Sequence, residues 1–339
     1  MKTRAIVAAL IAYFTFGICS TAFCKSHSGV VTIEVDLLAQ AQGQIARLWI
    51  PYPVSDREQL ISDIRTSGNY SAMAVYTDRT YGTAILYAEL PRHARSRKLK
   101  FSFAVERQEV RCDDLPLQES NWNPGDYALF LKPTTLGPID GEVKKLSDSI
   151  TRGKKTLVEK AKAIYDWTCE NMYRDPKVVG CGKGDVCQLL KTRGGKCTDI
   201  SSVFIALARA AGVPCREVFG IRLGQKTSEN ITAWQHCWAE FFLPGYGWVP
   251  VDPADVRKAM LREKLALQDA KTKEYRDYFW GGIDAYRVVI SRGRDITLNP
   301  PQEGAPLNTF AYPYAEVGGN PLDFYDPASF IYSITYRQK

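Results

Sequence analysis

Histidine is scarce in this sequence of 339 residues, which contains only His27, His93 and His236. His27 lies beside the N-terminal segment, and His93 lies in a basic loop. Histidine is a common general base and the commonest metal ligand, so its scarcity disfavours a histidine-rich metal site. We therefore expect no metal and no cofactor, and His236 becomes the candidate base.

Long apolar runs are also lacking beyond the N-terminus, which disfavours internal membrane spans. Residues 1–24 have the three parts of a secretory signal. These parts are a positive start at Lys2 and Arg4, an apolar stretch over Ala5–Ile18, and a cleavage end at Ser20–Ala22. Cleavage would leave a periplasmic or extracellular protein with no membrane insertion, and an uncleaved anchor is the alternative. A lipoprotein is disfavoured, because Phe23 precedes Cys24 where a small residue is expected.

Repeats and low-complexity tracts are absent, and the charge is spread along the chain. Apolar residues make up 45% and charged residues 24% of the sequence, as in ordinary globular proteins, and the net charge is +7. One basic run, over residues 92–100, is typical of a solvated loop. We therefore expect no nucleic-acid partner.

The most informative segment is Gly194-Gly195-Lys196-Cys197. Apolar residues recur at helical spacing after Cys197, and Gly212 with Pro214 ends the pattern. This predicts a helix that begins at or just after Cys197. Unpaired N–H groups and the helix dipole at such a position lower the pKa of a thiol and can bind an oxyanion. A buried structural cysteine or half of a disulfide is the alternative.

Residues 233–242 alternate and are rich in aromatic side chains, which predicts a strand that carries His236. A turn at residues 243–247 and a returning strand to Asp252 complete a hairpin. His236 and Asp252 then project from the same face, to within a two-residue register step. An aspartate in that place would fix the tautomer of the histidine and leave its other nitrogen for the thiol. Taken singly, each residue also fits a structural role.

At these residues the chain resembles the transglutaminase-like superfamily, which has a papain-like fold. The resemblance covers residues 140–257 and rests on three motifs in the family's order. They are Gly-Gly-Lys-Cys197 with Ala-Arg-Ala-Ala-Gly-Val-Pro214, then His236-Cys-Trp-Ala-Glu, then Gly-Trp248-Val-Pro-Val-Asp252-Pro. Bacterial secreted members are the most similar.

The resemblance implies a triad of Cys197, His236 and Asp252 that acts on amide bonds. Family members include transglutaminases, peptidases, deglycosylating amidases and relatives without catalysis. The zinc-binding Cys-x-x-Cys pairs of the deglycosylating members are missing here, and so is a calcium-loop signature. The resemblance therefore implies the site more closely than the substrate.

Nine cysteines are present, and seven remain after Cys19 and Cys24 are assigned to the signal segment and its cut. With Cys197 set aside as the reactive thiol, six could form three disulfides in an oxidising compartment. Their pairing stays open. A bridge from Cys181 or Cys187 could brace the wall of the active-site cleft.

The chain is long enough for two or three structural units. We expect an α+β protein with a signal peptide over 1–24, a β-sandwich-like domain over 28–120, a papain-like transglutaminase core over 140–257, and a C-terminal extension over 258–339 that packs on the fold. The core would be a central helix packed on an antiparallel sheet. Within these ranges we expect four strands in the first domain (Val30–Val35, Ile45–Ile50, Ala84–Leu90 and Leu99–Glu106), helices at residues 156–172 and 257–270, and a last strand over 330–336.

Other residues could contribute to the site. Gln188, Trp167 and Tyr173 are possible oxyanion donors by position, and the sequence does not rank them. Trp234 and Trp238 flank His236 and serve either packing or the cleft wall. Asp255 follows the proline after Asp252, so Asp252 is the preferred partner of His236.

The leading hypothesis is a secreted cysteine enzyme that forms an acyl-thioester from an amide or peptide carbonyl. Water as the acceptor would give a peptidase or amidase, and an amine would give a transglutaminase. The expected partner is a protein or peptide substrate, and the oligomeric state stays open. The alternative is a non-catalytic module of the same fold that binds peptides or envelope partners.

Overall fold

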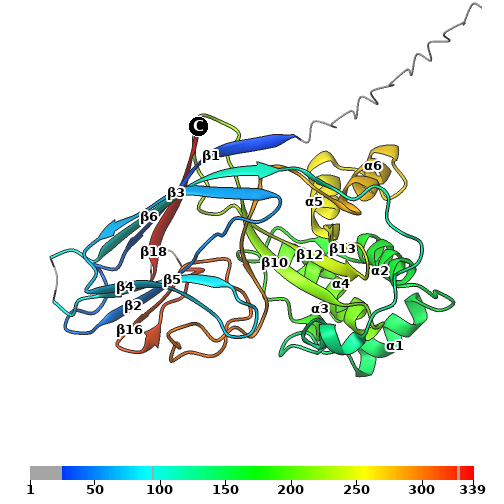
Figure 1. The fold of residues 1–339 in the computed structure, drawn as a ribbon, viewed down its shortest axis with the longest axis horizontal. Helices are drawn as coiled ribbons and strands as arrows, with labels where there is room; N and C mark the ends of the chain where they lie inside the picture. The colour runs from blue at the N-terminus through cyan, green and yellow to red at the C-terminus, as the bar shows by residue number, and fades with distance from the viewer. Residues whose placement is uncertain (1–24, 94, 327–328) are drawn as a thin grey trace, which may run out of the picture.

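The structure is a computed structural model that describes residues 25–93, 95–326 and 329–339. The signal segment predicted over residues 1–24 lies outside the described residues. Figure 1 shows two parts side by side, a pair of β-sheets and a mixed body of helices and strands. This arrangement confirms the α+β fold with an N-terminal sandwich and a papain-like core.

The sandwich consists of two five-stranded sheets. The first has the order β11 (Ser228–Asn230), β18 (Ile331–Gln338), β1 (Ser26–Asp36), β6 (Lys98–Gln108), β3 (Gln59–Gly68). The second has the order β17 (Asn320–Pro321), β16 (Tyr314–Val317), β2 (Ala46–Pro51), β5 (Ala84–Leu90), β4 (Ala72–Thr77). The four strands predicted in this region are all present, as β1, β2, β5 and β6.

Alternation explains why those four strands were predictable. In β1, Val31, Ile33 and Val35 are buried and their neighbours are more exposed, which is the pattern of a strand with one face on a core. The strands β3 and β4 were not predicted. They are edge strands and most of their residues are exposed, so the core imposes little apolar alternation on them.

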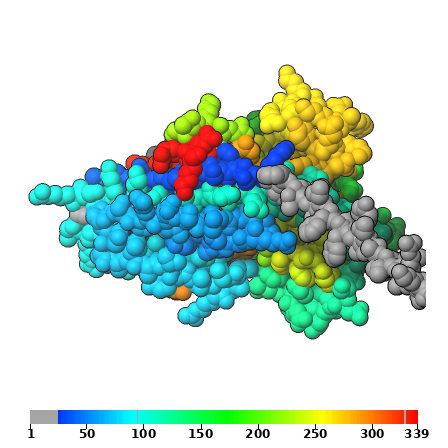
Figure 2. All heavy atoms as spheres, turned by 45° about the horizontal axis from the view of Figure 1, so that its top comes forward, coloured from blue at the N-terminus to red at the C-terminus, as the bar shows by residue number. Residues whose placement is uncertain are grey.

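The C-terminal segment completes both sheets of the sandwich. Strand β18 pairs with β1, and β16 pairs with β2. The strands β1 and β18 lie together in Figure 2, where the red C-terminal segment borders blue residues of the first strand. The range 258–339 therefore contributes strands to the sandwich. It also contributes a strand to the helical body.

The helical body contains a four-stranded sheet in the order β13 (Gly247–Val251), β12 (Gln235–Leu243), β10 (Cys215–Arg222), β15 (Arg287–Arg292). The helices around it are η1 (Pro124–Phe130), α1 (Gly141–Ile150), α2 (Leu157–Asn171), α3 (Val186–Thr192), α4 (Cys197–Ala210), α5 (Pro253–Glu263) and α6 (Ala270–Phe279). Two short pairs complete it, β7 (Val110–Arg111) with β14 (Gly282–Ile283) and β8 (Tyr173–Arg174) with β9 (Gly194–Gly195).

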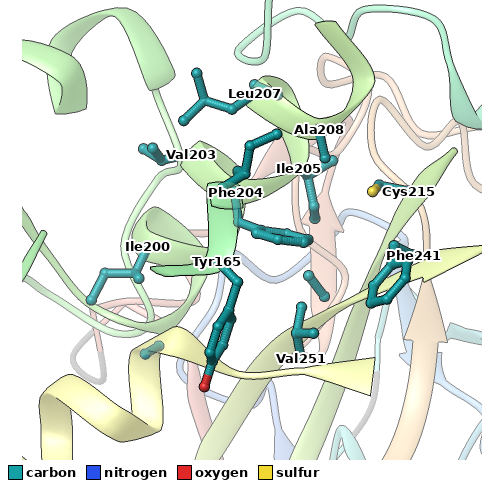
Figure 3. Close-up of a cluster of buried hydrophobic side chains, with 14 of the residues drawn as sticks. Tyr165, Ile200, Val203, Phe204, Ile205, Leu207, Ala208, Cys215, Phe241 and Val251 are labelled. Atoms are coloured by element: carbon teal, nitrogen blue, oxygen red, sulfur yellow. The ribbon is translucent and has the colours of Figure 1, made fainter. Parts of the chain in front are cut away.

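Helix α4 lies at the centre of this body, and every one of its residues is buried. A helix that is apolar around most of its surface belongs in a core, because no face needs to meet water. Figure 3 shows Phe204 of α4 above Tyr165 of α2, with Phe241 of the sheet to the right of Phe204 and Ile205. This packing holds the first residue of α4, Cys197, in a fixed place.

Two helix predictions had different outcomes. The helix predicted from Thr156 is α2, with Thr156 and Glu159 forming the expected capping box. The single helix predicted over 257–270 is wrong in its bounds. It begins earlier, because Pro253 suits the first helical turn, and it ends where Lys264 adopts a left-handed conformation at φ 56°. A separate helix, α6, follows from Ala270.

No disulfide joins the seven cysteines in the described part of the chain, which are all free thiols. The possible three bridges are therefore not formed. Cys169 and Cys215 are fully buried in the core and pack as small apolar side chains.

Across residues 25–93, 95–326 and 329–339, none of the helices combines the length and apolar character needed to cross a lipid bilayer.

Candidate active site

Cys197 is the first residue of α4, as the sequence predicts. The preceding strand β9 pairs with β8, which places Gly194 beside Tyr173 and Gly195 beside Arg174. A Cβ atom on Gly194 would lie 2.5 Å from the Tyr173 ring, and one on Gly195 would lie 2.4 Å from Asp199. The two glycines are thus required because the chain passes close to these side chains.

Asp199 organises the start of α4. Its carboxylate accepts the backbone N–H of Lys196 at 3.0 Å and that of Gly184 at 2.8 Å. The Thr198 N–H donates to the carbonyl of Cys181 at 2.9 Å. These bonds tie the loop before α3 to the helix start. The backbone N–H of Cys197 is at the first helical position, where no intrahelical acceptor is available.

His236 lies near the start of β12 and only 3% of its surface is exposed. Its Nε2 atom is 2.6 Å from Oδ2 of Asp252. The other ring nitrogen, Nδ1, remains for the thiol of Cys197, with which the imidazole interacts. The carboxylate therefore fixes the orientation of the imidazole.

Asp252 is fully buried at the end of β13, where it also caps α5. Ala239 of β12 pairs with Val251 of β13, and Asp252 follows directly. If the register continued, the position opposite Asp252 would be two residues along β12 from His236. While Oδ2 binds His236, Oδ1 accepts the N–H of Asp255 at 2.8 Å. The start of α5 thus positions the carboxylate.

Arg287, on β15, is a residue of the site that the sequence reasoning missed. It is fully buried and its guanidinium donates to Asp252, to Asp255 at 2.6 Å and to Asp284 at 3.1 Å. Asp255 Oδ1 lies 3.7 Å from Nε2 of His236, so a second carboxylate also reaches the imidazole. An isolated arginine in an apolar strand carries no motif that could have identified it.

Two pKa shifts oppose one another across the site. Hydrogen bonds from Cys181, Cys237 and His236, together with the charge of His236, hold the pKa of Cys197 well below that of an ordinary thiol. Burial alone would lower the pKa of His236, but the charges of Asp255 and Asp252 outweigh it and raise this pKa above 6.5. Both shifts favour a thiolate beside an imidazolium.

Three thiols meet at this point. The sulfur atoms of Cys181, Cys197 and Cys237 all lie within 4.8 Å of one another. Thr198 donates its hydroxyl to the Cys237 sulfur at 3.3 Å. The hydrogen bond with Cys197 raises the pKa of Cys181, and burial raises that of Cys237, so a negative charge is favoured on Cys197 over its two neighbours.

Two side-chain groups have the composition of a metal site, namely these three thiols and the trio His236, Asp252 and Asp255, whose ligand atoms also lie within 4.8 Å of one another. In the second group, however, the guanidinium of Arg287 already supplies the positive charge between the carboxylates. A cation there would have to compete with a buried arginine.

A cleft of about 790 Å³ opens over Cys197 and His236. One wall comes from α5 and the start of β12. Another part of the lining is aromatic and comes from the C-terminal segment, with Tyr312, Phe324, Tyr325, Phe330 and Tyr332. The segment that completes the sandwich thus also encloses the site.

The three residues considered as oxyanion donors, Gln188, Trp167 and Tyr173, do not belong to the residues that line this cleft. Gln235 does, and the sequence reasoning missed it. Its side-chain Nε2 is buried and has no hydrogen-bond partner in the described part of the chain. An unpaired donor next to His236 is available to a bound carbonyl.

The two tryptophans beside His236 have separate roles. Trp238 is buried and packs with Val218, Ile283 and Val289. Trp234 lines the cleft. Packing and the cleft wall were the two interpretations open for both.

Comparisons with known proteins identify the family of the chain. Residues 144–253 match the family model of the transglutaminase-like superfamily. An uncharacterized protein of Haemophilus influenzae is 40% identical over 323 residues, which cover 88% of this chain and 87% of the relative. The uncharacterized protein YebA of Bacillus subtilis is 30% identical over 215 residues, or 59% of this chain and 25% of that protein.

Among solved structures, a candidate cysteine protease from Cytophaga hutchinsonii is similar, with a TM-score of 0.56 and 16% identity. The match covers 92% of this chain and 98% of that one, and at this identity it shows a shared fold. Together with the family model and the H. influenzae relative, these findings lead to one conclusion: the chain belongs to the transglutaminase-like superfamily.

Proposed function

We propose that this protein is a cysteine-dependent acyl-transfer enzyme in which Cys197 is the nucleophile, His236 the general base and acid, and Asp252 the group that orients His236. The observation that carries the proposal is the buried 2.6 Å contact between His236 and Asp252 beside a free thiol at the start of a helix. A binding module has no need of these three groups together.

In the first step, the thiolate of Cys197 attacks the carbonyl carbon of an amide. A carbon–sulfur bond forms, and the π electrons move to the carbonyl oxygen. When the tetrahedral adduct collapses, the carbon–nitrogen bond breaks and the imidazolium of His236 gives its proton to the leaving nitrogen. The products are a free amine and a thioester on Cys197.

In the second step, His236 removes a proton from water or from an incoming amine, which attacks the thioester. The carbon–sulfur bond breaks and the thiolate returns. Water gives a carboxylate, as in a peptidase or amidase, and an amine gives a new amide, as in a transglutaminase. The Asp252 carboxylate stabilises the imidazolium through both steps.

The oxyanion needs donors, and two are at hand. They are the backbone N–H of Cys197 at the start of α4 and the unpaired amide of Gln235. Donors aimed at the developing negative charge supply a large part of the rate enhancement of acyl transfer.

The proposed substrates are proteins or peptides, because the cleft of about 790 Å³ is partly aromatic and is built on a protease-like fold. We also propose that residues 1–24 direct export and that residues 28–120, 140–257 and 258–339 act as the sandwich, the catalytic core and a shared extension. N-terminal sequencing of protein from the periplasm and the medium tests export. A mature chain that begins with Met1 would contradict signal cleavage.

Alkylation by iodoacetamide tests the nucleophile. The wild type should label at Cys197 faster than glutathione at neutral pH, and peptide mapping should locate the label. The variant Cys197→Ala should lose the fast phase, and Cys169→Ala serves as a matched control because Cys169 is buried in the same core. Labelling of Cys197 no faster than glutathione would refute the mechanism.

A further inference from the structure

The cleft contains basic side chains that the proposed chemistry does not use. One face of α5 presents Asp255, Lys258, Ala259 and Arg262 at helical spacing, and all four line the cleft. Strand β8 contributes Arg174, next to Gly195 in the β8–β9 pair, and the charge of Arg174 acts on Lys258. Two elements thus bring positive charge into the cleft that contains the thiol.

The acidic residues of the cleft are already engaged. Asp255 Oδ2 is bound by Arg222 at 2.6 Å and by Arg287 at 2.6 Å. Asp284 Oδ2 is bound by Arg287 and lies 3.3 Å from Arg222. Arg222 and Arg287 are thus paired with these two carboxylates, while Asp255 also acts on Lys258 through its charge.

Three cations of the cleft have no carboxylate partner within the described residues. They are Arg174, Lys196 and Lys258. Arg262, by contrast, is paired with Glu263 at 2.6 Å. The Nη1 atom of Arg174 is buried without any hydrogen-bond partner in the same set of residues, which is a costly state for a charged donor.

Lys258 is also held in an unfavourable place. Burial lowers the pKa of its ammonium, and the charges of Arg222 and Arg174 lower it further, against the opposing effect of Asp255. An ammonium that had a carboxylate partner of its own would not be expected to have a lowered pKa. An anion bound between Arg174 and Lys258 would satisfy the free guanidinium donor and compensate the partly buried ammonium.

We propose, building on the proposed function, that the acyl donor carries a carboxylate close to the scissile amide, and that Arg174 and Lys258 bind this carboxylate while Cys197 attacks the neighbouring carbonyl. The substrate class is therefore peptides with a free C-terminal carboxylate or an acidic side chain at the cleavage site. The aromatic wall of Tyr312, Phe324 and Tyr325 contacts the apolar part of the same substrate.

The simplest competing explanation is that the basic residues only stabilise the thiolate. Lys258 does interact with the charge of Cys197. That role would affect every electrophile equally, whereas carboxylate binding affects only those that carry a carboxylate. The two explanations can therefore be separated with a matched pair of reagents.

The test compares iodoacetate with iodoacetamide, which have almost the same shape and differ in charge. In both, the thiolate forms a sulfur–carbon bond and iodide leaves with the electron pair of the carbon–iodine bond. The measured quantity is the ratio of the two rate constants at Cys197, divided by the same ratio for glutathione. We expect the normalised ratio of iodoacetate to iodoacetamide to be about ten, because a basic cleft concentrates anions.

The variants Lys258→Gln and Arg174→Gln should each lower the ratio about threefold, as expected for the loss of one partly solvated charge pair. Lys258→Arg should retain it. Lys145→Gln is the matched control, since Lys145 is exposed on α1 and does not line the cleft. Added salt should lower the wild-type ratio, because it screens the attraction.

The outcomes separate this proposal from the proposed function. Fast iodoacetamide labelling with a normalised ratio near one would overturn carboxylate recognition and leave the nucleophile intact. An equal loss of rate with both reagents in Lys258→Gln would overturn it in favour of thiolate stabilisation. Slow iodoacetamide labelling of the wild type would instead refute the proposed function itself.

Discussion

Cys197 and Cys169 are two buried thiols of one apolar core, and their pKa values are shifted in opposite directions from that of an ordinary thiol. Burial raises the pKa of Cys169, near the end of α2, to about 12. The pKa of Cys197 is lowered, although it is just as deeply enclosed. The difference teaches that burial does not decide the reactivity of a thiol. Its hydrogen-bond partners and the charge of His236 do.

The largest expected difference between the two sites concerns catalysis. With p-nitrophenyl acetate as a generic acyl donor, Cys197→Ala should lower turnover by about 10⁴-fold or more, because no thioester can form. Cys169→Ala should keep the turnover and lower the free energy of unfolding by only about 1 kcal/mol. Equal turnover in the two variants would contradict the assignment of the nucleophile.

Replacing the base His236 should shift the pKa of Cys197 upward, towards the raised pKa of Cys169. His236→Gln should lower turnover by about 10³-fold, since it removes the proton carrier. The wild-type alkylation rate should be half-maximal at a pH below 9, the usual pKa of the thiol, because the folded-state pKa is lowered. His236→Gln should move this midpoint upward, because the imidazolium no longer favours the thiolate. A pH profile of iodoacetamide labelling measures both midpoints.

The ion pairs of Arg287 with Asp252 and Asp255, which support His236, should have their clearest effect on the free energy of unfolding. Arg287→Met leaves Asp252 buried without a guanidinium partner and removes one of the two that bind Asp255, which should cost about 3–5 kcal/mol in urea unfolding. The exposed pair of Lys273 and Asp277 provides the control, and Lys273→Met should change stability by less than about 1 kcal/mol. A small loss in Arg287→Met would mean that Arg287 is not needed to hold the two carboxylates.

The smallest of these effects concerns the oxyanion. Gln235→Leu should lower p-nitrophenyl acetate turnover by about 10²-fold, the usual loss of one oxyanion donor. Iodoacetamide labelling should not change, since alkylation develops no oxyanion. If labelling and turnover fell together, Gln235 would be acting on the thiol and not on the carbonyl.

The sequence could predict what depends on local chemistry. The helix that begins at Cys197 followed from apolar spacing and from Gly212 and Pro214, and the hairpin of His236 followed from alternation around a turn. The proximity of His236 and Asp252 followed from that hairpin, because residues of equal parity share a face of a strand.

Long-range contacts could not be predicted in this way. Arg287 reaches Asp252 through the pairing of β15 with β10, and no local pattern specifies that pairing. Cys181 approaches Cys197 through an irregular loop tied to α4 by the bond from the Thr198 N–H. The C-terminal strands complete the sandwich by pairing with residues about 300 positions away, such as Gly29 with Gln338. Such contacts depend on topology and not on propensity.

The central claim is that the partners of Cys197 lower its pKa and so favour the thiolate. The direct measurement is a pH titration of thiolate ultraviolet absorbance in the wild type, from which the same titration of Cys197→Ala is subtracted. We expect the difference to show one thiol that ionises well below pH 9, with a midpoint that rises in His236→Gln. A difference curve with its midpoint at or above 9, unchanged in His236→Gln, would contradict the account.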